Sequence, residues 1–304
     1  MRLELPTPIE CFDLAMEDGA TIRVRRHGNA DGARMFLSHG NGFAADAYLP
    51  FWGPLATRFE LIIFDFRNHG HNPPSDAANH NYAQMSRDLE RIFEGVTGRL
   101  GAKTNIGAFH SMSGRAAMKH AIEIGWRWDA LFLFDPPNIP LAGHPLHQPL
   151  MDFELKLIAW ASQRQDRFKD TGELAQQYAA LRSHKNWVEG AHDLMARSVL
   201  HREVETGDWV LSCRRELEAS IYRQALTLNL WPRYDEFGGP VKLIGADPSI
   251  KNPSPTAAAN FALHQENGYP FEAIAGSGHM LQLERPAECR KAVTSYLREL
   301  GIDF

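Results

Sequence analysis

One stretch near the middle of the chain, residues 104–114, constrains the fold more than any other. It opens with mostly apolar, β-favouring residues, and residues 116–122 beyond it have the apolar spacing of a helix. Ser111 lies between the two. A serine at a sharp strand-to-helix turn projects its hydroxyl at the top of a sheet, where the amides of the helix start face whatever that hydroxyl attacks. The stretch therefore predicts a strand, a turn and a helix, with Ser111 as a candidate nucleophile.

The composition is that of a globular protein. The chain has 304 residues, of which 44% are hydrophobic, enough for one large domain or a core with an insertion. A net charge of −5 without long runs of one sign does not indicate a nucleic-acid partner. The three cysteines are far apart, so they predict neither disulfides nor a metal site, and they favour a cytoplasmic location. We expect neither a signal peptide nor a membrane span.

Apolar runs predict a mostly parallel sheet. A hairpin is expected at residues 8–26, around the turn signal at residues 17–19. Buried strands are expected at 35–37, 61–64, 131–134, 241–245 and 271–274, with helical patterns between them, including residues 46–56 and the series Met85, Leu89, Ile92 and Val96. Strands that are apolar throughout and alternate with helices are typical of a parallel sheet covered on both faces.

The alternation breaks between residues 136 and 239. This region is predicted to be almost all helix, with one short extended piece at residues 208–211. Asp170, followed three residues later by Glu173, predicts the start of one of the helices. We therefore expect an α/β core made of residues 1–135 and 240–304, interrupted by a helical cap of residues 136–239 that covers the carboxyl ends of the strands.

Residues whose side chains could take part in a reaction follow several of the predicted strands, at the edge where ligands bind in open parallel sheets. Ser111 follows one strand, and His279 follows the last strand in a loop with glycines on its N-terminal side. The glycine-rich residues 39–43 follow another, and Asp135 and Asp247 each come after a strand. A serine, a histidine that accepts its proton and an acid that orients the histidine form a known nucleophilic set.

The run His110-Ser111-Met112-Ser113-Gly114 resembles the nucleophile elbow of the α/β-hydrolase family, whose usual form is Gly-x-Ser-x-Gly. Phe109 and Ser113 stand where small residues are usual. We expect the Phe109 ring to press on a neighbouring strand or to fill a gap left by a small residue. The resemblance extends over almost the whole chain, and parts of the inserted segment are similar to the cap of a lipase-like branch.

The resemblance implies an α/β-hydrolase fold, with a mostly parallel eight-stranded sheet, helices on both faces and an inserted helical cap. It further implies a serine hydrolase of the lipase or esterase type that uses no metal or organic cofactor. His279 would be the general base for Ser111. Backbone amides of Asn41 and Met112 would form an oxyanion hole.

Two residues are candidates for the acid that orients His279. Asp247 has the commoner family position, although it lies two residues after Gly245 rather than the usual three. Asp135 follows the strand after the elbow, a position that some members use, and a proline follows it here. The sequence leaves both candidates open.

The resulting functional hypothesis is cleavage of a small-molecule carboxylic ester, thioester or lactone through an acyl-enzyme on Ser111. One alternative is another reaction of the same residues, namely C–C bond hydrolysis, acyl transfer or amide cleavage. A second is a ligand-binding member of the fold without turnover. The oligomeric state is left open, with a homodimer as one option.

Overall fold

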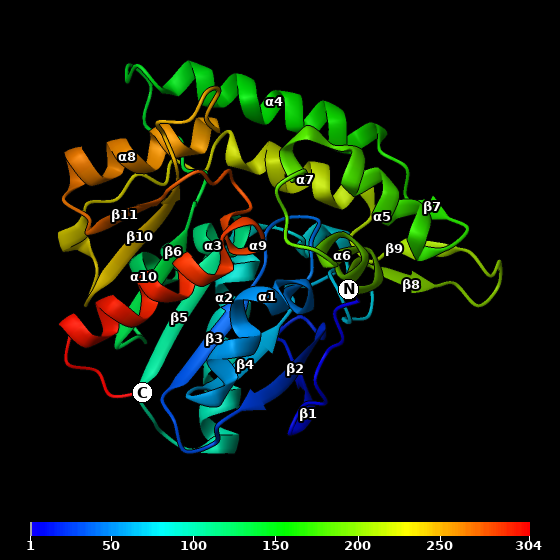
Figure 1. Ribbon diagram of the computed structural model, residues 1–304, viewed down its shortest axis with the longest axis horizontal. Helices are drawn as coiled ribbons and strands as arrows, with labels where there is room; N and C mark the ends of the chain where they lie inside the picture. The colour runs from blue at the N-terminus through cyan, green and yellow to red at the C-terminus, as the bar shows by residue number, and fades with distance from the viewer. Residues whose placement is uncertain (1) are drawn as a thin grey trace.

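A computed structural model describes residues 2–304, and its centre is an eight-stranded sheet (Figure 1). The strand order is β1-β2-β4-β3-β5-β6-β10-β11. β1 and β2 form the predicted hairpin and are antiparallel to their neighbours, whereas all other pairs are parallel. The strands are β1 Glu10–Ala15, β2 Thr21–Gly28, β3 Arg34–Ser38, β4 Glu60–Phe64, β5 Asn105–His110, β6 Ala130–Phe134, β10 Val241–Ala246 and β11 Phe271–Ile274. The predicted sheet is confirmed.

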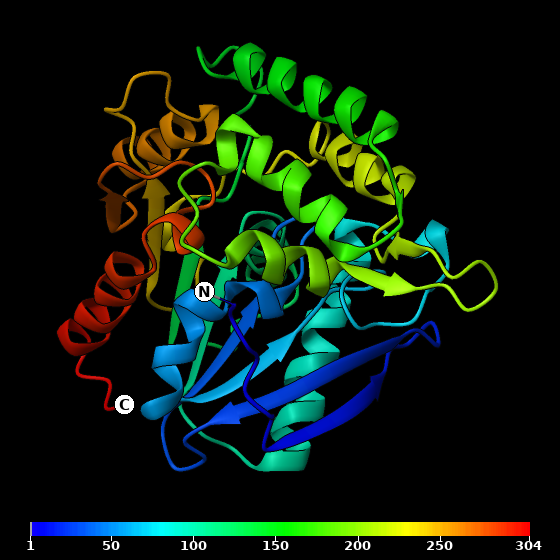
Figure 2. The same ribbon diagram turned by 45° about the vertical axis from the view of Figure 1, so that its right-hand side comes forward.

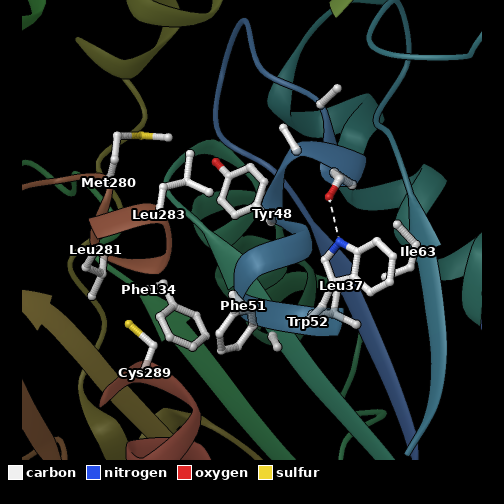
Figure 3. Close-up of a cluster of buried hydrophobic side chains, with 14 of the residues drawn as sticks. Leu37, Tyr48, Phe51, Trp52, Ile63, Phe134, Met280, Leu281, Leu283 and Cys289 are labelled. Atoms are coloured by element: carbon white, nitrogen blue, oxygen red, sulfur yellow. Dashed lines mark hydrogen bonds between the residues drawn. The ribbon is translucent and has the colours of Figure 1, made fainter. Parts of the chain in front are cut away.

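Helices cover both faces of the sheet because side chains along each strand alternate between the faces. Phe36 of β3 packs with the helices of one face, whereas Met35 and Leu37 pack with those of the other. The first face carries α2 (Tyr82–Leu100), α3 (Met112–Glu123) and α8 (Pro255–Asn267), and the second carries α1 (Leu49–Trp52), α9 (Leu281–Glu284) and α10 (Pro286–Glu299). Figure 3 shows the second face, where Phe51 and Trp52 of α1 lie against side chains of the strands and of α9.

The helix expected at residues 46–56 is instead three short pieces. A 3-10 turn at Ala45–Tyr48 leads into α1, and a second 3-10 turn follows at Gly53–Thr57. Pro50 and Pro54 start the second and third pieces. Proline lacks an amide hydrogen, so neither residue can donate the hydrogen bond that would continue the preceding turn as a regular helix. Further 3-10 turns lie at Ala77–Asn79, Arg182–His184 and Tyr234–Glu236.

The segment between β6 and β10 contains both helices and a small sheet. Its helices are α4 His147–Gln163, α5 Thr171–Ala180, α6 Ala191–Val199 and α7 Arg215–Ala225. The Asp170 side chain accepts from the amide of Glu173, which confirms the predicted start of α5. The expected extended piece is β9 (Trp209–Leu211), but it pairs with β7 (Arg167–Phe168) and β8 (Leu200–Arg202) in a three-stranded antiparallel sheet. Strands this short carry no readable alternation, which explains why the sequence missed β7 and β8.

This segment between β6 and β10, called the inserted segment below, contacts the carboxyl ends of the parallel strands. The side chain of Ser212 donates to the carbonyl of Gly70, after β4, and Asn41, after β3, donates to the carbonyl of Glu218. In Figures 1 and 2 α4 and α7 run above the end of the sheet that carries these loops. Among residues 2–304, no helix has the length and apolar character that crossing a membrane requires.

Phe109, the unusual residue of the elbow strand, is fully buried. Its ring packs edge-on against Trp128 and Phe64, at centroid distances of 5.5 and 6.3 Å. The space that it fills is left by Gly107, since a Cβ at that glycine would lie 2.8 Å from the Phe109 ring. The small residue was expected in a neighbouring strand, but it lies in β5, the strand of Phe109 itself.

We predict that Phe109→Ala lowers the free energy of unfolding by about 3–5 kcal/mol, because it removes buried apolar area and leaves a cavity. Urea denaturation followed by fluorescence measures the change. Phe261→Ala, at a ring that is 38% exposed, is the matched control and should cost much less. Equal losses in the two variants would contradict the packing described for Phe109.

Candidate active site

Ser111 occupies a strained turn between β5 and α3. Its φ of 53° and ψ of −113° lie outside the regions that most side chains adopt. The turn is held by Ser113, whose hydroxyl donates to the carbonyl of His110 and accepts from its amide, both at 2.9 Å. The amide of Ser111 donates to the carbonyl of Phe134 on the neighbouring strand. A glycine at position 113 could not make these two hydrogen bonds, because they need the serine hydroxyl.

The loop after β3 lies directly against this elbow. A Cβ at Gly40 would approach His110 Nδ1 to 3.0 Å and the Cβ of Ser111 to 3.3 Å, so a larger residue would push the loop away. Asn41 follows, and its side-chain amide donates to the carbonyl of Glu218 at 2.9 Å. Met112 is the first residue of α3, so its amide has no acceptor within the helix. The loop of Asn41 and the amide of Met112 thus flank Ser111, as the sequence suggested, and their role in holding an oxyanion stays a prediction.

His279 reaches Ser111 from the loop after β11. Its Nε2 accepts from the Ser111 hydroxyl at 3.0 Å. The loop is fixed on both sides of the histidine, since the Ser277 hydroxyl donates to the carbonyl of Ile274 and the amide of Gly278 donates to a carboxylate oxygen of Glu284. Ser111 itself is 7% exposed, whereas the side chain of His279 is 31% exposed.

Asp135 lies on the other side of the His279 ring. His279 Nδ1 donates to Asp135 Oδ2 at 2.6 Å, and the aspartate is fully buried. Three further donors serve its carboxylate, namely the hydroxyl of Thr256, the amide of Ala246 at 3.1 Å and Asn260 Nδ2 at 2.9 Å. Burial alone would raise the pKa of Asp135, but the bond and charge of His279 and these donors hold that pKa below its usual value.

Asp247 does not reach the ring of His279. Its carboxylate accepts from the amide of Gly276 at 2.7 Å and from the amide and hydroxyl of Ser249. Its own amide donates to the carbonyl of Ser277. The carboxylate of Asp247 is thus engaged in the turn before His279 and not at the ring of His279. Of the two candidate acids, the structure brings only Asp135 to the serine and histidine.

His110 and Tyr48 are site residues that the sequence analysis missed. His110 Nε2 donates to the backbone carbonyl of His279 at 2.9 Å, which leaves Nδ1 to accept from the Tyr48 hydroxyl at 2.8 Å. The Tyr48 oxygen in turn accepts from the amide of Gly40 at 3.1 Å. This chain of hydrogen bonds ties the loop after β3, the elbow and the loop of His279 together. The histidine directly before Ser111 was the only signal in the sequence.

Within residues 2–304, one group of side chains has the spacing of a metal site. Ligand atoms of His69, His80 and Cys213 lie within 4.8 Å of one another and are buried. Both ring nitrogens of His69 are engaged, because Nδ1 donates to a backbone carbonyl and Nε2 accepts from the amide of Gly42. His80 Nδ1 accepts from Asn68, so its proton is on Nε2. His80 Nε2 has no hydrogen-bond partner, but a metal there would require the ring proton on Nδ1 and so would break the bond from Asn68. The Cys213 thiol donates to the carbonyl of Arg214 at 3.9 Å.

The fold and this site define a family. The model of the alpha/beta hydrolase family matches residues 35–292, and the chain belongs to that family. The matched region begins in β3 and ends in α10, so it includes the inserted segment and every residue placed around Ser111 above.

Solved structures with the same fold carry several activities. An E-2-(acetamidomethylene)succinate hydrolase is 19% identical, with a TM-score of 0.76 over 95% of this chain and 100% of that one. A thioesterase domain from the curacin biosynthetic pathway is 17% identical, with a TM-score of 0.68 over 94% and 98%. An esterase from Exiguobacterium antarcticum is 16% identical, with a TM-score of 0.69 over 95% and 100%. At these identities the likeness shows the fold.

Buried histidines near the site make stability depend on pH. Burial lowers the pKa values of His80, His110 and His184 to about 3, from an ordinary value near 6.5. Between these values the unfolded chain binds protons that the folded protein does not, so stability falls as the pH falls below about 6.5. The raised pKa of His71, caused chiefly by its bond to Asp46, acts in the opposite direction but is a single group.

We therefore predict that the free energy of unfolding falls between pH 7 and pH 5, by up to about 1.4 kcal/mol per pH unit for each such histidine. Urea denaturation at pH 7, 6 and 5 measures it. His110→Gln should flatten the dependence relative to the wild type. A stability that is constant over this range would show that these histidines bind protons in the folded protein.

Proposed function

We propose that the protein hydrolyses a carboxylic ester, thioester or lactone through an acyl-enzyme on Ser111. The observation that carries this proposal is the continuous chain from the Ser111 hydroxyl through His279 to the buried Asp135, with distances of 3.0 and 2.6 Å. The strained backbone of Ser111 supports it too, because strain of this kind is concentrated at functional sites.

In the proposed reaction, His279 Nε2 takes the proton of Ser111 while the serine oxygen bonds to the substrate carbonyl carbon. The carbonyl oxygen becomes an oxyanion that accepts from the amides of Asn41 and Met112. The same His279 proton passes to the oxygen or sulfur of the breaking bond as the tetrahedral intermediate collapses to the acyl-enzyme, so that this group leaves as an alcohol or thiol. Water then repeats both steps, with His279 as its base, and releases the acid and free Ser111.

Asp135 serves this sequence by keeping the His279 proton on Nδ1, so that the lone pair of Nε2 faces the serine. It also stabilises the imidazolium formed in each step. The four donors around its carboxylate keep it ionised, which is the state that both tasks require.

The same residues would also serve amide cleavage, C–C bond hydrolysis or acyl transfer, since one fold hosts many chemistries. Substrate panels should therefore include thioesters and amides, because similar structures include a thioesterase and a hydrolase of an acetamido compound. A binding protein without turnover is the remaining alternative.

A fluorophosphonate probe tests the nucleophile. We expect it to label the folded wild type at Ser111, and we expect Ser111→Ala to abolish both labelling and ester turnover while keeping the melting temperature. His279→Ala should cost a similar factor in kcat, because residues that act as a unit are not additive. Turnover that persists in Ser111→Ala would contradict the mechanism, and an unlabelled wild type would favour the binding protein.

A pair of variants tests the acid. Asp135→Asn should lower kcat by up to about 10⁴-fold with little change in KM, because asparagine favours the wrong tautomer of His279. Asp247→Asn is the matched control, and its effect should be modest, since its carboxylate only shapes the turn before His279. Steady-state kinetics with circular dichroism of both variants separates lost catalysis from lost folding. A severe loss in Asp247→Asn alone would reverse the assignment.

A further inference from the structure

Helix α4 of the inserted segment buries a carboxylate and exposes apolar side chains. Glu154 is one of its three buried residues, with Leu150 and Ala161. Leu155 and Trp160 on the same helix are 50% and 43% exposed. An ordinary surface helix does the reverse, and burying a carboxylate costs free energy unless it is paired. The burial of Glu154 therefore indicates a specific role for its carboxylate.

One oxygen of Glu154 is paired with the helix that carries the nucleophile. Arg115 Nη2 donates to Glu154 Oε1 at 2.7 Å, and both side chains are 2% exposed. Arg115 lies one turn after Ser111 on α3, and its amide donates to the carbonyl of Ser111 at 3.0 Å. The ion pair thus holds the Glu154 carboxylate over the first turn of α3.

The second oxygen of Glu154 is unused. Within residues 2–304, Oε2 is buried and has no hydrogen-bond partner. Arg115, the partner of Oε1, lies one turn after Ser111, so this carboxylate is placed beside the start of α3 by geometry. A buried carboxylate oxygen without a donor is costly, and the cost is removed when a bound molecule supplies the donor.

Tyr222 of α7 adds a second polar group at the same place. Burial raises its pKa, and the negative charges of Glu218 and Glu154 raise it further. The residue is half-buried. Helices α4 and α7 pack side by side above the elbow (Figure 1), so these two groups come from adjacent elements.

The charges around this place are balanced. Arg115 pairs with Glu154, and Arg164 pairs with Glu218 at 2.7 Å. Neither guanidinium is left as a spare cation for an anionic group. The atoms of the Arg115–Glu154 pair that are buried without a hydrogen-bond partner are Glu154 Oε2, an acceptor, and Arg115 Nε, a donor. The Tyr222 hydroxyl can donate or accept.

We propose that Glu154 Oε2 and the Tyr222 hydroxyl form a substrate subsite for a hydrogen-bond donor, which is a hydroxyl, an amide N–H or an ammonium group. The substrate is then a polar carbonyl compound rather than the ester of a plain alkyl chain. This inference rests on the proposed function, since it concerns the substrate of the Ser111 reaction.

Matched esters test the subsite. Two series are compared, in which the acyl chain or the alcohol carries a terminal hydroxyl, ammonium or methyl group, each over several chain lengths. We expect the wild type to prefer a donor-bearing ester over its methyl counterpart by roughly 10²-fold or more in kcat/KM at one chain length at least. The hydroxyl and ammonium arms identify which donor is favoured.

Three variants separate this role from simple docking of the inserted segment. Glu154→Gln keeps the size and an oxygen for Arg115 but presents an amide N–H to the substrate, so the preference should fall to near one while the methyl ester is still cleaved. Glu218→Gln, in the other buried ion pair, is the matched control and should keep the preference. Tyr222→Phe should reduce it partly.

The outcomes are distinct. A wild-type ratio near one at every chain length overturns the subsite, as does an equal loss for all esters in Glu154→Gln, which would indicate docking alone. If Glu154→Gln does not fold, fluorophosphonates with hydroxyl and methyl chains decide the question on the wild type by their labelling rates. Failure of the proposed function looks different, because then no ester is cleaved and no probe labels Ser111.

Discussion

The hydrogen bond between His279 and Asp135 is the contact on which the site depends, because it joins loops from two strands that are not neighbours. Asp135 follows β6, His279 follows β11, and β10 lies between them. The backbone of Asp135 has a φ of 44°, which is unfavourable for an aspartate. Donors from β10 and α8 hold the carboxylate in spite of that strain. The acid is therefore fixed by the core, and His279 is placed against it.

Titratable groups around the site follow one rule: carboxylates are buried with partners, and histidines are buried neutral. Asp65 illustrates the first case, since its carboxylate accepts from Arg25 and from the amide of Ala45. His110 illustrates the second, since a carbonyl and the Tyr48 hydroxyl satisfy both nitrogens of an uncharged ring. In a region of low dielectric, these are the arrangements that avoid an unpaired charge. The side chain of His279, by contrast, is 31% exposed.

The sequence predicted the sheet well because the parallel strands are mostly apolar, with charged residues inside a strand only at places such as Lys242 of β10 and Glu272 of β11. It could not choose between Asp135 and Asp247, because both follow strands at the same edge and the difference lies in how a turn directs one carboxylate. The sequence could not predict the ion pairs of the inserted segment, for a different reason. Arg115 and Glu154 are separated by 39 residues, and Arg164 and Glu218 by 54, so neither pair leaves a local pattern.

The inserted segment and the loop of Asn41 constrain each other. Glu218 accepts from the Asn41 side chain through its carbonyl, and its carboxylate stands over Gly42, where a Cβ would lie 2.5 Å from Oε1. Gly42 has a φ of 73°, so both its backbone and its surroundings require glycine. The amide proposed to hold the oxyanion therefore belongs to a loop that is shaped partly by α7. Since the same helix carries Tyr222, the elements that would recognise a substrate also position the group that would stabilise its transition state.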